Sequence, residues 1–126
     1  MYKFLLVILF SFFMCNIYAN GFILDSLEEA QSLSKSTKQP ILVIFGSENC
    51  SFCTKLMADI DSGQLTTYLD PYIICYIDLN KNEEYKEKYK VNMIPDSRLI
   101  SNGKETSKAT GYTKIEYIQW LKNAKR

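Results

Sequence analysis

Two cysteines separated by two residues are the part of this sequence best suited to chemistry. Cys50 and Cys53 enclose Ser51-Phe52 and follow a polar loop, residues 46–49, that ends a run of apolar residues. Apolar side chains recur every four residues across segment 52–60, which predicts a helix beginning at the cysteines. The N–H groups at a helix start favour an anion, so a thiolate at Cys50 would be stabilised there. Cys53, one turn later, could then resolve a mixed disulfide formed by Cys50.

The first 19 residues differ in composition from the rest of the chain. Lys3 is their only charged residue, and residues 4–14 are apolar apart from Ser11. This run is too short to cross a hydrocarbon core, which needs about 20 residues. It predicts a signal peptide over residues 1–19, cleaved after Ala19, and one domain over residues 20–126. A buried first helix and an uncleaved membrane anchor are the alternatives. The expected location is periplasmic or secreted, with no membrane span after cleavage.

The remaining composition limits the kind of site. The chain has four cysteines and no histidine, which excludes His-based triads, His-ligated zinc and c-type haem. Beyond the dithiol the mature chain would keep only Cys75, which lies in an apolar run and is expected to be a buried free thiol. A zinc site would need a second pair of ligands. A purely structural disulfide and Cu(I) binding by two thiolates stay open as alternatives. No cofactor or metal is predicted.

Size and charge indicate one globular domain without a nucleic-acid partner. The chain has 126 residues, of which 47% are hydrophobic and 13% aromatic. This length and composition suit a single core. Lys plus Arg number 15 against 14 Asp plus Glu, a formal net charge of +1. This balance gives no basic surface for nucleic acid. We expect a monomer.

The order of predicted elements gives an α/β fold. Apolar runs, capping boxes at Ser26 and Thr113, and the turn Asn102-Gly103 define them. The predicted helices are residues 26–36, 51–60, 62–69, 83–89 and one beginning at Thr113; the predicted strands are 41–45, 72–77, 98–101 and 105–109. A parallel crossover in the first half and a hairpin in the second predict a mixed central β-sheet flanked by helices on both faces.

The strand 41–45, the dithiol and the segment Val91-Asn92-Met93-Ile94-Pro95 resemble the thioredoxin superfamily, and the similarity extends over about residues 26–122. The resemblance implies a thioredoxin-like fold in which Cys50 and Cys53 are the catalytic, redox-active pair. It also implies a cis Ile94–Pro95 bond facing the dithiol, with Ile94 and Pro95 binding substrate. The implied activity is thiol–disulfide exchange with exported protein substrates. An upstream redox partner, not identified by the sequence, would exchange electrons with the dithiol.

Several positions depart from the pattern of thioredoxins. Asn49 stands where they carry Trp, and Ser51-Phe52 replaces Gly-Pro. Ile44 replaces a buried Asp and Ile74 a nearby Lys, so the proton acceptor for the resolving thiol is missing or supplied otherwise. Glu48 is a candidate, although a solvated loop carboxylate is the favoured interpretation. The cluster around the cysteines is closer to exported thioredoxin-like reductases and isomerases.

Three functions therefore compete. The favoured one is a disulfide reductase, because the dipeptide between the cysteines lacks a His that would stabilise the thiolate strongly. An oxidase or isomerase would use the same residues. The second is a non-enzymatic interaction module, in which Asp96 and Arg98, beside the segment that ends at Pro95, bind a specific partner. The third is a carrier of Cu(I).

Overall fold

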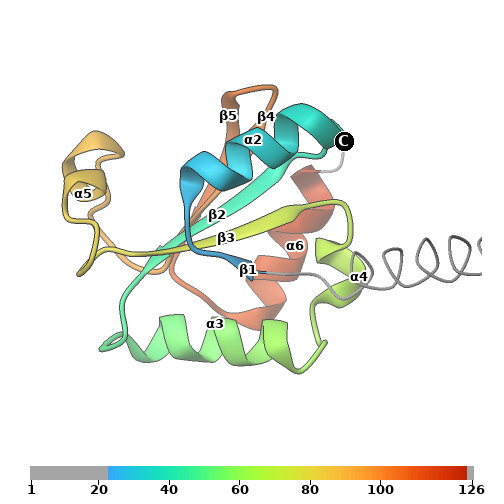
Figure 1. The fold of residues 1–126 in the computed structure, drawn as a ribbon. Coiled ribbons are helices and arrows are strands. Elements are labelled where there is room, and N and C mark those ends of the chain that lie inside the picture. The colour runs from blue at the N-terminus through green and yellow to red at the C-terminus, as the bar shows by residue number, and fades with distance from the viewer. Residues whose placement is uncertain (1–22, 125–126) are drawn as a thin grey trace, which may run out of the picture.

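A mixed five-stranded sheet forms the centre of the molecule in a computed structural model that describes residues 23–124 (Figure 1). The strands lie in the order β1-β3-β2-β4-β5. β1, β3 and β2 run parallel, whereas β4 and β5 are antiparallel to their neighbours. The strand bounds are β1 Ile23–Leu24, β2 Ile41–Gly46, β3 Ile73–Asp78, β4 Asp96–Ser101 and β5 Lys104–Thr110. The predicted mixed sheet is confirmed.

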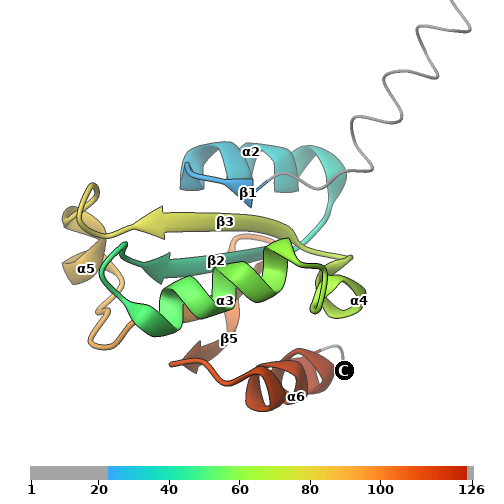
Figure 2. The same ribbon diagram turned by 90° about the horizontal axis from the view of Figure 1, so that it is seen from below.

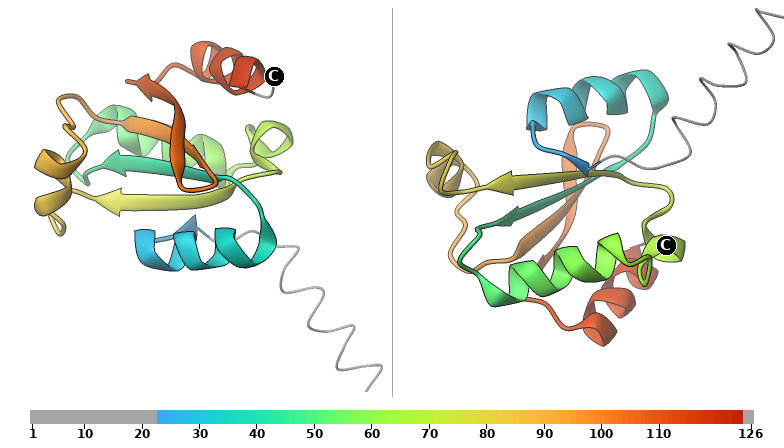
Figure 3. Two further views of the ribbon diagram at one scale, coloured as in Figure 1. Left: turned by 90° about the horizontal axis from the view of Figure 1, so that it is seen from above. Right: turned by 60° about the horizontal axis from the view of Figure 1, so that its bottom comes forward.

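Helices cover both faces of this sheet, as Figures 2 and 3 show from several sides. α2 (Leu27–Thr37) lies on one face, and side chains of the short helix α5 (Glu84–Lys88) reach the same core cluster. α3 (Ser51–Asp61), α4 (Thr66–Leu69) and α6 (Lys114–Ala124) pack on the other. Among residues 23–124, no helix is long and apolar enough to cross a membrane.

The central position of β2 in the sheet explains why its residues are all apolar and do not alternate with polar ones. Successive side chains of a strand point to opposite faces of the sheet. Val43 and Phe45 therefore enter the cluster under α2, whereas Leu42 and Ile44 enter the cluster under α3 and α6. All four are at most 1% exposed, since both faces are covered. Such a strand holds its carboxyl end, where the dithiol loop begins, in a fixed position.

The predicted N-caps and the predicted hairpin turn are present in the structure. The Ser26 hydroxyl accepts the Glu29 N–H at 3.3 Å, and the Thr113 hydroxyl accepts the Glu116 N–H at 3.4 Å, so both predicted N-caps form. The hairpin turns at Asn102-Gly103, whose φ angles of 53° and 78° are both left-handed. Such angles are those of a type I′ turn, the tight turn that Asn-Gly favours.

Three elements differ from the prediction. The helix expected over residues 62–69 covers only Thr66–Leu69, because Gly63 adopts φ +84° and separates it from α3. β4 begins at Asp96 rather than Arg98, directly after Pro95. β1 was not predicted, since two residues carry too little pattern. The predicted signal peptide, residues 1–19, and the domain start at residue 20 lie outside the described residues.

Candidate functional site

The dithiol lies where β2 passes into α3. Cys50 and Cys53 are joined in a disulfide. Their exposure differs: Cys50 is half-buried at the surface, whereas Cys53 is only 1% exposed, beneath the first turn of the helix. A sulfur on an external partner can therefore approach Cys50 but not Cys53, which gives the two cysteines unequal roles.

The start of α3 is built around Cys50. Cys50 is the N-cap residue, with extended backbone angles of φ −100° and ψ 111°. Its Sγ accepts the backbone N–H of Cys53 at 3.2 Å, and its carbonyl oxygen accepts the N–H of Thr54 at 3.0 Å. A side-chain acceptor at this position satisfies one of the free N–H groups of the helix start. When the disulfide is reduced, the same N–H and the helix dipole favour a thiolate on Cys50.

The segment before β4 faces this sulfur. The Sγ of Cys50 lies 3.7 Å from the carbonyl oxygen of Ile94. The Ile94–Pro95 peptide bond is cis, and the Pro95 carbonyl oxygen accepts the Gly111 N–H at 2.8 Å. The structure thus brings all four predicted site residues together. The cysteines come from the loop after β2 and the start of α3, and Ile94 and Pro95 come from the segment that begins 44 residues beyond Cys50.

Arg98 holds both ends of this segment, which we call the substrate loop (residues 90–95). Its Nε and one terminal nitrogen donate to the two carboxylate oxygens of Asp96, each at 3.0 Å. That terminal nitrogen also donates to the carbonyl oxygen of Tyr89. Asp96 follows the loop directly and Tyr89 precedes it. One guanidinium, stacked 5.5 Å from the ring centroid of Phe45, therefore fixes the distance that the loop must span.

This arrangement corrects one hypothesis from the sequence. Asp96 and Arg98 were considered as contacts for a partner, but they are 0% and 6% exposed and bind each other. Hydrogen bonding to Asp96 raises the pKa of Arg98 further, so the guanidinium stays charged. We call the bonds of Arg98 to Asp96 and Tyr89 the Arg98 clamp. The sequence analysis did not predict it, although opposite charges two residues apart in a strand lie on the same face of the sheet.

The side chains of the sheet that pack beneath α3 include apolar residues and a tyrosine, Tyr76. Ile44 and Ile74 pack in the cluster that contains Leu56 of α3, so neither position supplies a charged group. Tyr76 belongs to the same cluster, and its hydroxyl lies over Gly46, where an added Cβ would be 2.4 Å from that oxygen. Burial, together with the Asp78 and Glu48 carboxylates, raises the pKa of Tyr76, so its hydroxyl stays protonated.

Cys75 lies away from this chemistry. It is fully buried in β3, on the face covered by α2, and is not joined to another cysteine. Burial, with the nearby carboxylates of Asp25 and Glu29, raises the pKa of its thiol to about 12. Across residues 23–124, no three Cys, Asp or Glu side chains gather into a group that could hold a metal ion. The predicted burial of Cys75 is confirmed.

Two exposed apolar side chains belong to the segments that meet at Cys50. Phe52, inside the dithiol motif, is 57% exposed, and Met93, beside Ile94 in the substrate loop, is 61% exposed. Exposed apolar groups on segments that adjoin a reactive sulfur are suited to contact with another chain. The sequence named both residues but not this role, which only the exposure of their side chains reveals.

Burial and helix position lead us to expect unequal thiol reactivity in the reduced protein. Iodoacetamide at pH 8 should modify Cys50 first, because its sulfur is accessible and its thiolate is favoured. Cys75 should stay unmodified, since a thiol with a pKa of about 12 is neutral at that pH. Peptide mass spectrometry measures the three rates, with urea-unfolded protein, in which all three should react alike, as the control. Equal labelling of Cys50 and Cys53 in the folded protein would contradict this assignment.

Removing the guanidinium from the Arg98 clamp should lower the stability of the protein strongly. Arg98→Met leaves the Asp96 carboxylate buried without its guanidinium, so the free energy of unfolding should fall by about 3–5 kcal/mol. Lys108→Met is the matched control, because its ammonium lies 3.6 Å from the same carboxylate but its side chain is 41% exposed. It should cost less than about 1 kcal/mol. Urea unfolding of both variants compares them, and similar losses would disprove the special role of Arg98.

Comparisons with known proteins agree with this geometry. Residues 27–125 match the family model of the thioredoxin-like domain. The thioredoxin of Rickettsia bellii (strain RML369-C) is 29% identical over 86 residues, covering 67% of this chain and 80% of that protein. Among solved structures, a poplar thioredoxin h has a TM-score of 0.70 at 15% identity, covering 82% of this chain and 95% of that one. Fasciola hepatica thioredoxin has a TM-score of 0.67 at 20% identity, covering 81% and 97%. Since the family match spans most of the sequence, this chain belongs to the thioredoxin-like domain family.

Proposed function

We propose that this protein reduces disulfides in exported protein substrates through Cys50 and Cys53. Membership of the thioredoxin-like family, together with the Cys50–Cys53 pair, supports thiol–disulfide exchange in general. The single observation that carries the proposal is the asymmetry of the pair: an accessible sulfur capping a helix, backed by a buried one. A purely structural bridge has no need of this asymmetry.

The exchange takes place in two balanced steps. The Cys50 thiolate attacks one sulfur of a substrate disulfide, forms an intermolecular disulfide, and releases the other substrate sulfur as a thiolate. Cys53, as thiolate, then attacks the Sγ of Cys50. The intramolecular disulfide forms and the second substrate thiolate leaves. Two electrons pass to the substrate, and an upstream dithiol must supply two more to reduce the protein again.

The substrate loop gives the incoming chain a place to pair. The Ile94 carbonyl oxygen is 3.7 Å from the reacting sulfur. An extended peptide whose cysteine is bonded to Cys50 would therefore bring its own backbone to Ile94, where strand-like hydrogen bonds can orient it. Phe52 and Met93, both exposed, would cover the apolar side chains next to that cysteine. Together these contacts support substrate binding by Ile94 and Pro95.

The direction of electron flow follows from how strongly the Cys50 thiolate is stabilised. A dithiol becomes a strong oxidant when its reduced form is especially stable. Here the Cys53 N–H and the helix dipole act on the sulfur, whereas Ser51 and Phe52 between the cysteines supply no positive charge. This moderate stabilisation favours the reductase over the oxidase.

Reduction of insulin by dithiothreitol, followed as turbidity, tests the proposal. Wild-type protein should accelerate it, and Cys50→Ser should return the rate to that of dithiothreitol alone, because the attacking sulfur is gone. Cys53→Ser should accumulate a stable mixed disulfide with insulin, visible by mass spectrometry. Cys75→Ala, in which both reacting sulfurs remain, is the control and should keep the activity. Wild-type protein without any acceleration would favour the interaction module instead.

Export is the second part of the proposal, supported by the pattern of Lys3, the short apolar run and Ala19. Protein purified from its native host should begin at Asn20, as intact mass spectrometry would show. An intact Met1 on protein from the cytosolic fraction would remove the exported substrates from the proposal while leaving the exchange chemistry in place.

A further inference from the structure

A cleft of about 660 Å³ opens beside the dithiol, between the substrate loop and α5. Ser47 of the dithiol loop and Ile94 both line it, so it is continuous with the place where substrate would meet Cys50. We call it the α5 cleft. In Figure 1, α5 and the first turn of α3 lie at the same end of the molecule.

The inner wall of the α5 cleft is apolar and the outer wall is acidic. Leu79 and Val91, both buried, line its inner part. The charged side chains that line it are three carboxylates and one ammonium, those of Glu83, Glu84, Glu87 and Lys86.

The carboxylates of this wall have no partner in the described part of the chain. The ion pairs found among residues 23–124 all involve Asp96 or Arg98, and none involves a side chain of the cleft. The other lysine of the helix, Lys88, does not line the cleft, and its ammonium lies over the rings of Tyr85 and Tyr89 at 5.9 and 5.7 Å. The lining of the cleft itself therefore carries more negative than positive charge, while Lys81 and Lys90 of the same segment do not line it.

We propose that the α5 cleft selects polypeptide substrates with basic residues beside the reactive cysteine. The inference rests on the proposed function, since it concerns the chain that Cys50 attacks. A peptide paired with Ile94 extends from the sulfur into the cleft on one side. Lys or Arg suits that place, because the apolar stem packs on the inner wall while the charged end reaches the carboxylates.

Synthetic peptides test this directly. Each carries one cysteine in a mixed disulfide with thionitrobenzoate, flanked by Lys, Gln or Glu on either its N-terminal or its C-terminal side. Reduced wild-type protein attacks the disulfide, and release of the coloured thiolate gives the rate. At low salt, Lys on one side should react about three to ten times faster than Glu, with Gln between them. In 1 M salt, where the Debye length is about 3 Å, the ratio should approach one.

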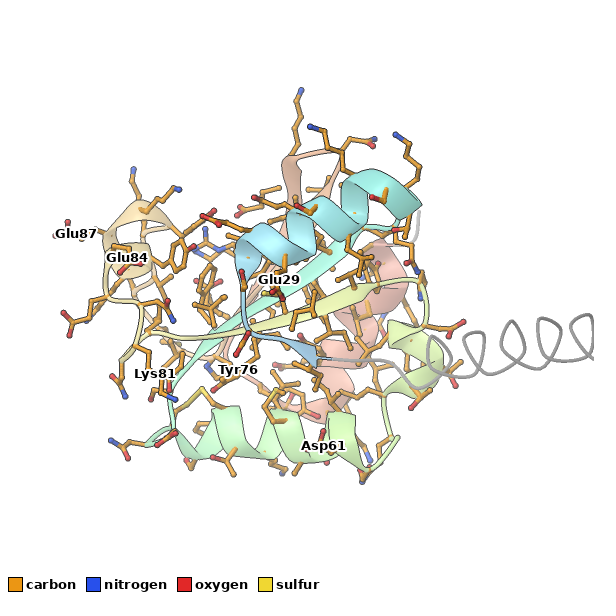
Figure 4. All side chains as sticks on the ribbon, viewed as in Figure 1. Glu29, Asp61, Tyr76, Lys81, Glu84 and Glu87 are labelled. Atoms are coloured by element: carbon orange, nitrogen blue, oxygen red, sulfur yellow. A yellow bond between two sulfur atoms is a disulfide. The ribbon has the colours of Figure 1, made fainter. Side chains whose placement is uncertain are left out.

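Charge reversal assigns the effect to the cleft. In Glu84→Lys/Glu87→Lys the preference, measured as the ratio of the Lys-peptide rate to the Glu-peptide rate, should invert. Asp61→Lys/Asp70→Lys is the matched control: it makes the same change in net charge at exposed positions, and Figure 4 shows Asp61 far from Glu84 and Glu87. The control should keep the wild-type preference.

The outcomes separate this inference from the proposed function. Equal rates for Lys and Glu peptides, or inversion in the control as well, would overturn the cleft inference while leaving the exchange chemistry intact. If wild-type protein reacts with no peptide, or Cys50→Ser reacts as fast, the proposed function itself fails.

Discussion

The guanidinium of Arg98 is the interaction on which the site geometry depends. It joins the residue that follows the substrate loop, Asp96, to the carbonyl of the residue that precedes it, Tyr89, and it also bonds to Glu105 on β5. The loop between these anchors presents Ile94 to Cys50 and Met93 to solvent. A loop tied at both ends by one rigid, charged group has few conformations to lose when a substrate binds, so more of the binding energy remains for orientation.

The dithiol shows a second constraint, between the helix end and the sheet beneath it. The first turn of α3 supplies N–H groups that suit a negative sulfur, whereas the sheet below supplies apolar side chains that do not. Cys50 lies on the favourable side of this boundary and Cys53 on the unfavourable side. In that environment the raised pKa of Tyr76 keeps its hydroxyl protonated, so this tyrosine does not serve as a base for Cys53.

Most of the fold could be predicted from the sequence, because most of its elements have strong local sequence patterns. The apolar run 41–45, the turn Asn102-Gly103 and the two N-caps each leave a signal within a few residues. The position of Cys50 and Cys53 at the start of a helix could be predicted for the same reason. What sequence alone could not supply depends on distant partners: Asp96 enters a strand because Arg98 neutralises it there, and the α5 cleft needs segments 79–87 and 91–94 side by side. Gly63 delays the start of the helix predicted over residues 62–69 to Thr66, because its left-handed backbone does not fit a helix.

Gly46 and Tyr76 act as one packing unit at the edge of the dithiol loop. The tyrosine ring, from the neighbouring strand, fills the volume that any side chain at position 46 would need. The sizes of residues 46 and 76 are therefore inversely coupled, and substitutions at the two positions are not additive. Among relatives, a bulky residue at the position of Gly46 should coincide with a small one at the position of Tyr76. The volume at the end of β2, just before the loop that leads to Cys50, can thus be filled by a side chain from either strand.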